Sequence, residues 1–152
     1  MPESSQTRRA RWVYNLVPAI RRTGMRITYI GSDWMEVKIK LPLNWKTRNY
    51  HGTLFGGSMY AAIDPAYLVM LSKILGKDYM VWDKAATIRF RKPAKTTMYA
   101  TFLLDHEEIN SIKSTLQQQK KVDRVYKVDL TDKNGIIHAS FEKTLHILKK
   151  DS

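Results

Sequence analysis

The stretch from Phe55 to Gly76 reads FGGSMYAAIDPAYLVMLSKILG and is the most apolar segment of this 152-residue chain. Met59, Ile63 and Met70 fall on one helical face, and other apolar residues cover much of the remaining circumference. The paired glycines suit the start of a helix, and Gly76 suits a C-terminal cap. A helix that is apolar almost all round must be buried on most sides, so this segment predicts the centre of the fold.

Asp64 interrupts this apolar helix two turns after its start. An unpaired buried carboxylate is costly and tends to become neutral, so a functional role is one explanation for its presence. Two structural explanations also stand: a position on the one wet edge of the helix, or a neighbouring cation. Pro65 follows directly and removes one backbone hydrogen bond, which predicts a local kink at Asp64.

The flanking sequence predicts strands on both sides of the central helix. Met35, Val37, Ile39 and Leu41 alternate with polar residues, which is the period of a strand with one wet face. The predicted strands cover residues 25–30, 35–41, 80–91, 97–104, 124–130 and 136–148. Asp132 to Gly135 predicts a hairpin turn, residues 42–54 an irregular loop, and residues 105–121 a polar surface helix.

The N-terminal region predicts a short amphipathic helix over residues 8–22, which Thr23-Gly24 ends. Its apolar residues at helical spacing are Trp12, Val13, Leu16, Val17 and Ile20. Pro18 is expected to distort the last turn.

The order of elements is therefore a helix, two strands, one long buried helix, and four strands with a surface insertion. An antiparallel sheet curled around the central helix buries that helix economically. The sequence predicts an α+β fold in which residues 1–152 form one domain and residues 1–24 are a basic N-terminal arm and helix.

Composition limits the chemistry that the chain can carry. Hydrophobic residues make up 43% and charged residues 26%, as in ordinary globular domains. The chain has no cysteine, which excludes disulfides, thiolate nucleophiles and cysteine-ligated zinc. The four histidines lack metal-ligand spacing, so we expect no metal site. No segment reaches the roughly 18 apolar residues of a membrane helix, so we expect a cytoplasmic protein without a membrane partner.

The formal charge of +12 points to partners of negative charge. Nucleic acid, an acidic protein and a polyanionic small molecule such as coenzyme A all suit it, and solubility alone is a further explanation. Arginines interleaved with Trp12 and Tyr14 favour nucleic acid, but no RNA-recognition, KH or zinc-finger pattern is present. Nucleic acid is therefore the weaker alternative.

The loop before the central helix, NYHGTLFGG from Asn49 to Gly57, brings polar groups and glycines to the helix N-terminus. Exposed amides there, aided by the helix dipole, can stabilise negative charge that develops on a carbonyl oxygen. A glycine-rich turn needed only for tight packing explains the same residues equally well. A serine nucleophile at Ser58 is disfavoured, because Tyr60 stands where the G-x-S-x-G motif requires glycine.

Read from Asn49, the chain follows the pattern N-x-x-G-x-x-H-G-G at every specified position except the histidine, and it continues to an aspartate in the helix. This pattern resembles the phenylacetate-pathway-type (PaaI-like) acyl-CoA thioesterases of the hotdog fold, and most of all a tetrameric-thioesterase-like branch of that superfamily. The matching residues are Asn49, Gly52, Gly56, Gly57 and Asp64. Phe55 stands where the family has a histidine, and its ring can neither hold a water nor donate to a carbonyl.

The resemblance implies hydrolysis of an acyl-CoA or acyl-carrier thioester, with coenzyme A present only as part of the substrate. It implies a homodimer, or a dimer of dimers, in which Asp64 of one subunit meets loop residues of the other. Asp64 would be the general base or the nucleophile, the Gly57 amide would bind the thioester carbonyl, and Asn49 would orient the water or that carbonyl. His51 is a possible substitute for the missing histidine.

Phe55, Gly56 and Ser58 are expected to line the substrate site next to these groups. Arg89, Arg91 and Lys92 are expected to bind the phosphates of coenzyme A, since the spacing places both arginines on one strand face. A solvated strand face is the alternative for these cations. Because Phe55 replaces the histidine, a non-catalytic acyl-CoA-binding protein on the same fold is the alternative function. The histidine and glutamate signatures of hotdog dehydratases are absent.

Overall fold

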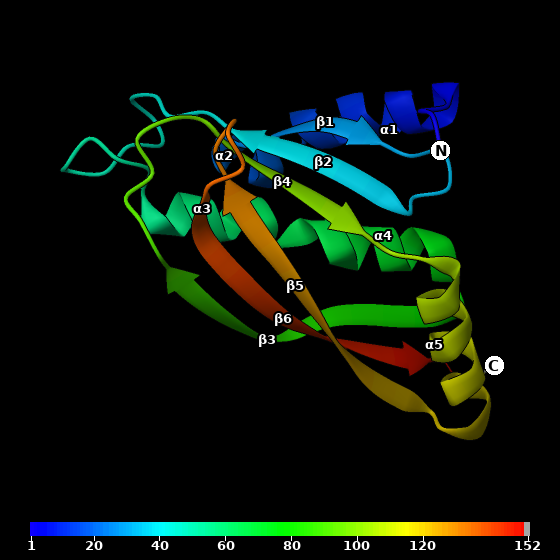
Figure 1. The fold of residues 1–152 in the computed structure, drawn as a ribbon. Coiled ribbons are helices and arrows are strands. Elements are labelled where there is room, and N and C mark those ends of the chain that lie inside the picture. Colours follow the sequence, from blue (N-terminus) through cyan, green and yellow to red (C-terminus); the bar gives the residue numbers. More distant parts are fainter. Residues whose placement is uncertain (151–152) are drawn as a thin grey trace.

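A computed structural model describes residues 1–150 as five helices and six strands in the predicted order (Figure 1). The helices are α1 (Ser5–Leu16), α2 (Pro18–Arg22), α3 (Gly56–Ile63), α4 (Pro65–Leu75) and α5 (His106–Gln118). The strands are β1 (Arg26–Ile30), β2 (Glu36–Leu41), β3 (Tyr79–Phe90), β4 (Met98–Leu103), β5 (Lys121–Thr131) and β6 (Ile137–Lys149).

All six strands form one antiparallel sheet in the order β1-β2-β4-β5-β6-β3. The pairing of β4 with β5 is limited to Tyr99 and Thr131, and the two strands diverge beyond that point (Figure 1). The sheet bends there, so that β1, β2 and β4 lie on one side of α3 and α4 while β5, β6 and β3 lie on the other. The predicted hotdog fold is confirmed.

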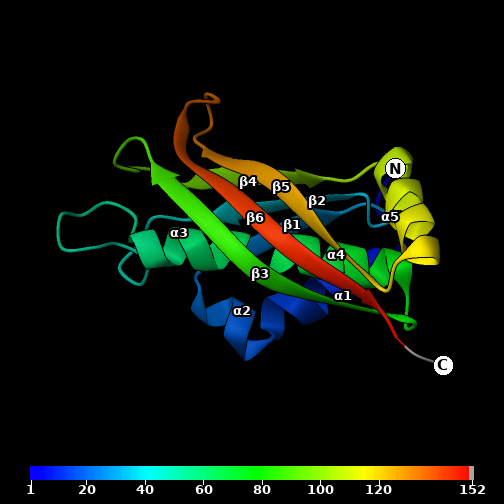
Figure 2. The same ribbon diagram turned by 90° about the horizontal axis from the view of Figure 1, so that it is seen from below.

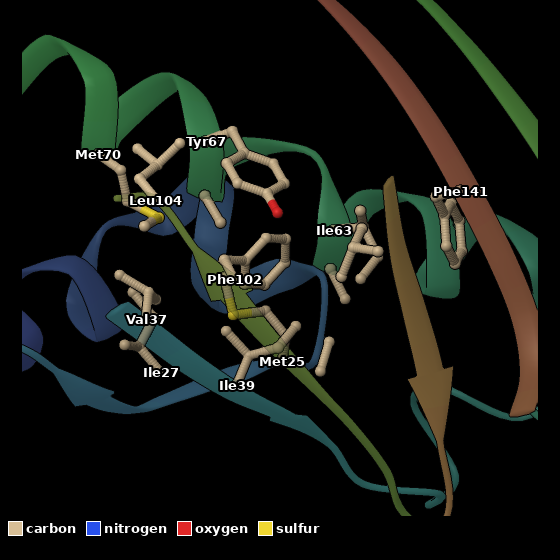
Figure 3. Close-up of a cluster of buried hydrophobic side chains, with 14 of the residues drawn as sticks. Met25, Ile27, Val37, Ile39, Ile63, Tyr67, Met70, Phe102, Leu104 and Phe141 are labelled. Carbon is tan, nitrogen blue, oxygen red and sulfur yellow. The ribbon is translucent and has the colours of Figure 1, made fainter. Parts of the chain in front are cut away.

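The hydrophobic core lies between the concave face of the sheet and the central helices (Figure 3). Alternate residues of β2 and β4 point inward, and Phe102 of β4 is fully buried. Tyr67 of α4 meets the Phe102 ring edge-on, with centroids 5.2 Å apart. Burying one such aromatic side chain contributes about 2 to 3 kcal/mol, so the helix and sheet stabilise each other.

The central helix is broken at Asp64, where the sequence predicts a kink. α3 ends at Ile63 and α4 begins at Pro65, which occupies the first-turn position where a missing backbone N–H costs nothing. The break places the Asp64 side chain at the junction of two helices, near the middle of the concave sheet face.

The N-terminal helix is also divided, because Val17 precedes Pro18 and leaves the helical conformation. Trp12, Val13 and Leu16 of α1 face solvent. Toward the sheet, Tyr14 packs against the hydrophobic core, and the Asn15 side chain bonds to the backbone N–H and C=O of Ile27 at 2.8 and 2.9 Å.

The two edges of the sheet therefore differ. At β1, the Asn15 amide replaces a neighbouring strand and α1 covers the edge (Figure 1). At the other edge, the twelve-residue strand β3 pairs only with β6 among residues 1–150, and most of its residues are exposed. Long open edges of this kind are templates for pairing with another chain. No helix within residues 1–150 has the length and apolarity needed to cross a membrane.

Candidate functional site

Asp64 is held at the helix break by a buried lysine. The Lys143 ammonium lies 2.8 Å from Asp64 Oδ1, 2.6 Å from the Asp64 backbone oxygen and 2.7 Å from Asp83 Oδ1. The two contacts with Asp64 are hydrogen bonds, and the contact with Asp83 is an ion pair. Lys143 is 0% exposed, whereas 43% of the Asp64 side chain remains accessible. One oxygen of the carboxylate is thus held by Lys143, while much of the Asp64 side chain remains accessible to solvent.

Lys143 is absent from the sequence-predicted site, although a signal for it exists. The inward-facing residues of β6 are Ala139, Phe141, Lys143, Leu145 and Ile147. A lysine at the centre of an otherwise apolar strand face requires a partner. The nearest acidic residue on the same strand, Glu142, points to the opposite face, so the sequence pattern could raise the question but could not name Asp64 or Asp83.

Tyr60 lies one helical turn before Asp64 and faces the same site. Burial raises the pKa of the Tyr60 hydroxyl above its usual value of 10, and the charge of Asp64 raises it further. Tyr60 therefore remains a neutral hydroxyl group at neutral pH, beside the carboxylate.

Asn49 organises the loop that precedes α3. Its Oδ1 accepts hydrogen bonds from the backbone N–H groups of His51 and Thr53, at 3.0 and 3.1 Å, and its Nδ2 donates to Thr53 Oγ1 at 2.8 Å. The role of Asn49 in orienting a water or carbonyl stays a prediction. The His51 ring is exposed and packs edge-on against Tyr50, so the structure gives it no contact with Asp64.

A hollow of about 320 Å³ brings several sequence-predicted residues together at the start of α3. Its lining residues are Asn49, Thr53, Leu54, Gly56, Met59, Phe90, Arg91, Lys92, Pro93 and Ala94. Asn49, Gly56, Arg91 and Lys92 therefore lie around one hollow, and their roles in substrate binding stay predictions. Asp64 does not line this hollow.

The N-terminus of α3 presents its first amides without a side-chain cap. Phe55 occupies the N-cap position and makes no side-chain hydrogen bond, while the half-buried Ser58 lies in the first turn. The Phe55 ring packs so closely on Gly57 that an added Cβ would lie 2.5 Å from it. The Phe55 side chain is 56% exposed, so a ligand could meet this ring at the surface.

Arg89 and Arg91 share one face of β3, as their spacing predicts. Both line a second hollow on the outer sheet face, together with Lys127. Arg91 also lines the hollow beside Asn49, and its Nε donates to Ser140 Oγ at 2.8 Å. Arg91 therefore connects the two hollows, whereas Arg89 lies on the outer face only.

Within one chain, the carboxylate and the glycine amides lie at opposite ends of α3. Gly57 and Asp64 are seven residues apart, which separates them by roughly 10 Å along a helix. In a single subunit, the Asp64 carboxylate and the Gly57 amide therefore lie too far apart to act on the same carbonyl group.

A curled antiparallel sheet around a broken central helix defines a protein of the hotdog fold. The chain belongs to the family described as "Domain of unknown function (DUF4442)", which matches residues 6–147. No curated protein matches the sequence.

Solved structures of several bacterial proteins share this fold over nearly the full chain. A Pseudomonas aeruginosa protein of unknown function, PA5026, described as a probable thioesterase, has 21% identity and a TM-score of 0.84, covering 99% of both chains. The Haemophilus influenzae thioesterase HI1161 has 14% identity and a TM-score of 0.70, covering 97% of this chain and 93% of its own. A mutant of the P. aeruginosa thioesterase PA1618 has 11% identity and a TM-score of 0.69, covering 99% and 96%. At these identities the likeness shows the fold.

Proposed function

We propose that this protein hydrolyses an acyl-CoA thioester to a free acid and coenzyme A, with Asp64 as the catalytic carboxylate. The observation that carries the proposal is the Asp64 side chain, anchored by Lys143 at the helix break and still accessible from outside. A carboxylate whose geometry is fixed on one oxygen and which remains open to solvent is suited to act on a water or a substrate.

In the general-base route, Asp64 takes a proton from water as the water oxygen bonds to the thioester carbonyl carbon. The C–S bond of the resulting tetrahedral intermediate then breaks, and the coenzyme A thiolate takes up a proton. In the nucleophilic route, Asp64 attacks the carbonyl carbon itself, and the C–S bond breaks to leave an anhydride and the coenzyme A thiolate, which takes up a proton. Water then hydrolyses the anhydride to the free acid and restores Asp64. Both routes need a donor for the oxyanion, which the Gly57 amide at the N-terminus of α3 supplies.

A homodimer joined through β3 would bring these two halves together. The open edge of β3 favours pairing with a second β3, and a twofold axis there runs the two α3 helices in opposite directions. The C-terminal end of one α3, with Asp64, then approaches the N-terminal end of the other, with Gly57. Each dimer would hold two such composite sites.

The cations of the β3 end are proposed to hold the phosphates of coenzyme A. Arg91 and Lys92 line the hollow next to Gly56, and Arg89 follows on the outer face. A small apolar cavity of about 20 Å³ begins beside Pro65 and Ala66, directly after Asp64, and is lined by side chains of β1, β2 and α1.

The test is thiol release from a panel of acyl-CoAs by the purified protein and by Asp64→Asn. We expect hydrolysis of at least one acyl-CoA and a loss of roughly 100-fold or more in the variant, since a positioned general base contributes that much. Undiminished hydrolysis in Asp64→Asn would remove Asp64 from the mechanism.

The matched control is Asp83→Asn, because Asp83 is the other carboxylate on Lys143. Both substitutions remove one anion from the same ammonium, but only one removes the proposed base. We expect Asp83→Asn to retain most of the activity. Equal losses in the two variants would assign Asp64 a structural role.

A second candidate function, binding of acyl-CoA without turnover, is favoured by the Phe55 ring on Gly57. In this case no acyl-CoA releases thiol, while a non-hydrolysable thioether analogue binds in titration calorimetry. That combination would replace the hydrolase proposal.

A further inference from the structure

Three apolar side chains of α1 face solvent rather than the sheet. They are Trp12, Val13 and Leu16, at 63%, 54% and 62% exposure. The side toward the sheet is already filled by Tyr14 and by polar contacts, including Asn15 with Ile27 and the 2.8 Å ion pair of Arg11 with Glu3. The apolar side of a helix is normally the buried side, so this face of α1 is suited to an external partner.

A second exposed tryptophan lies beside this helix. Trp45, in the loop after β2, is 76% exposed and lines an open hollow of about 980 Å³ together with Leu16 and Pro18. The remaining lining residues are Arg21, Arg22, Gly24, Arg26, Asn44 and Lys46. Cations therefore surround the apolar side chains. We call this surface of α1, α2 and the Trp45 loop the basic aromatic face.

The chain segment that forms most of the basic aromatic face contains no acidic residue. Residues 8–26 contain six arginines and no aspartate or glutamate. Arg8, Trp12 and Leu16 follow one another at intervals of four along α1, so cationic and apolar side chains share one stripe. The Lys46 ammonium lies 5.1 Å from the centre of the Trp45 ring, which joins the two kinds of side chain at the loop as well.

We propose that the basic aromatic face docks on the surface of an anionic lipid bilayer. Tryptophan rings favour the headgroup level of a bilayer, aliphatic side chains enter the acyl boundary, and arginines contact the lipid phosphates. Each of these side-chain types is exposed here on one contiguous surface. The expected absence of a membrane partner rests on the lack of a spanning segment, and peripheral docking requires none.

Other occupants fit this surface less well. Nucleic acid would use the arginines and tryptophans but leaves Val13 and Leu16 without a role, since bases stack on aromatic rings. A second copy of the chain packed on the same face would bring its own cluster of cations against this one. The docking proposal does not depend on the proposed hydrolysis, because it involves neither Asp64 nor the β3 edge.

The experiment is co-sedimentation of the full chain with vesicles at physiological ionic strength. One set of vesicles is phosphatidylcholine alone, and the other is phosphatidylcholine mixed with phosphatidylglycerol. We expect binding to the mixed vesicles only, and quenching of tryptophan fluorescence when the acyl chains are brominated. Absence of binding to the mixed vesicles would overturn the proposal.

Two double variants separate the parts of the surface. Trp12→Ser with Trp45→Ser should abolish the quenching, because Trp34 and Trp82 lie outside the basic aromatic face. Arg21→Gln with Arg22→Gln should weaken binding roughly 30-fold, as expected for two basic residues at an anionic surface. The control pair, Lys113→Gln with Lys133→Gln, removes the same charge from α5 and the β5–β6 turn and should bind like the original chain.

Three results would contradict the assignment. If the two charge-removing double variants weakened vesicle binding equally, binding would depend on net charge alone and not on this surface. Retained quenching without Trp12 and Trp45 would place the contact elsewhere. Tight binding of RNA or DNA that Arg21→Gln with Arg22→Gln abolishes, without vesicle binding, would assign the surface to nucleic acid.

Discussion

Among residues 1–150, Lys143 is the only charged residue that is fully buried. A lysine can occupy such a position when all three of its N–H groups have acceptors and its charge is matched. Here Asp64 at the helix junction accepts two hydrogen bonds from Lys143, and Asp83 of β3 is a second ion-pair partner. The ammonium therefore ties the broken central helix to the sheet and sets the position of Asp64.

Lys143→Met tests how much the contacts of this one residue contribute to the stability of the fold. The substitution keeps an unbranched side chain, shorter by one atom, but leaves Asp64 and Asp83 near each other without a cation. Both carboxylates remain partly accessible to water, so we expect a loss of about 2 kcal/mol in the free energy of unfolding, less than for a fully buried charge left unpaired. Urea unfolding monitored by circular dichroism measures it.

The matched control for this substitution is Lys127→Met, which removes an exposed cation from β5. Its ion pair with Glu142 is long, at 3.6 Å, and solvent-exposed, so we expect a change near zero. If both variants lost the same stability, the buried network would have no special role.

At the scale of elements, α1 is attached to the sheet by polar groups and by Tyr14, while Trp12, Val13 and Leu16 take no part in the attachment. The Arg11 guanidinium bonds to the Glu3 carboxylate through two nitrogens, at 2.8 and 3.1 Å. This charge-assisted pair lowers the pKa of Glu3 below its ordinary value of 4.5. Together with Asn15, it holds a helix whose outer face is free to serve another purpose.

The lowered pKa of Glu3 predicts a pH-dependent contribution to stability. Because the carboxylate is favoured in the folded state, its contribution is fully present above pH 4.5 and is lost as the pH falls through the folded pKa. Thermal unfolding of the original chain and of Glu3→Gln should differ by up to about 1 kcal/mol near neutrality. The difference should vanish in acid, and a constant difference at all pH values would contradict the ion-pair explanation.

At the scale of the whole molecule, the two sheet edges and the distribution of charge give the fold distinct surfaces. α1 covers the β1 edge, and the β3 edge is open. α1 and α2 lie together on one side of the molecule (Figure 2), and they form the basic aromatic face with the Trp45 loop. The proposed dimer and the proposed membrane contact therefore use different elements. A dimer could hydrolyse its substrate while both copies of the basic aromatic face remain available.

Ala85→Lys tests the proposed dimer at this scale. Ala85 is exposed on the open edge strand, so a lysine there would face its own copy across the twofold axis. We expect the variant to be monomeric by light scattering and to lose hydrolysis in parallel, because each site would lack its second half. A variant that remains dimeric and active would exclude pairing through this part of β3.

Thr144→Lys is the control, since Thr144 pairs with Ala85 in the β3–β6 register. The added charge lies on the same face of the sheet but one strand away from the open edge. We expect this variant to keep the dimer and the activity of the original chain.

The sequence alone predicts most of the fold, because its strongest signals are local. Strand alternation such as Met35 to Leu41 and the apolar run around Met59 to Leu75 depend only on neighbouring residues, and each is realised. Pro65 and Pro18 mark the two helix breaks for the same reason: proline acts on the turn in which it stands.

Asp64 could be singled out from sequence because it is anomalous in its own helix, but its partner could not. Lys143 follows it by 79 residues, and their contact depends on which strands are neighbours and in which register they pair. The orientation of α1 is likewise decided by tertiary structure. Apolar periodicity shows that one side of the helix carries apolar residues, whereas the hydrogen bonds of Asn15 to the Ile27 backbone help to set which side faces the sheet. Local chemistry determined the elements and the unusual carboxylate, and long-range pairing decided what surrounds them.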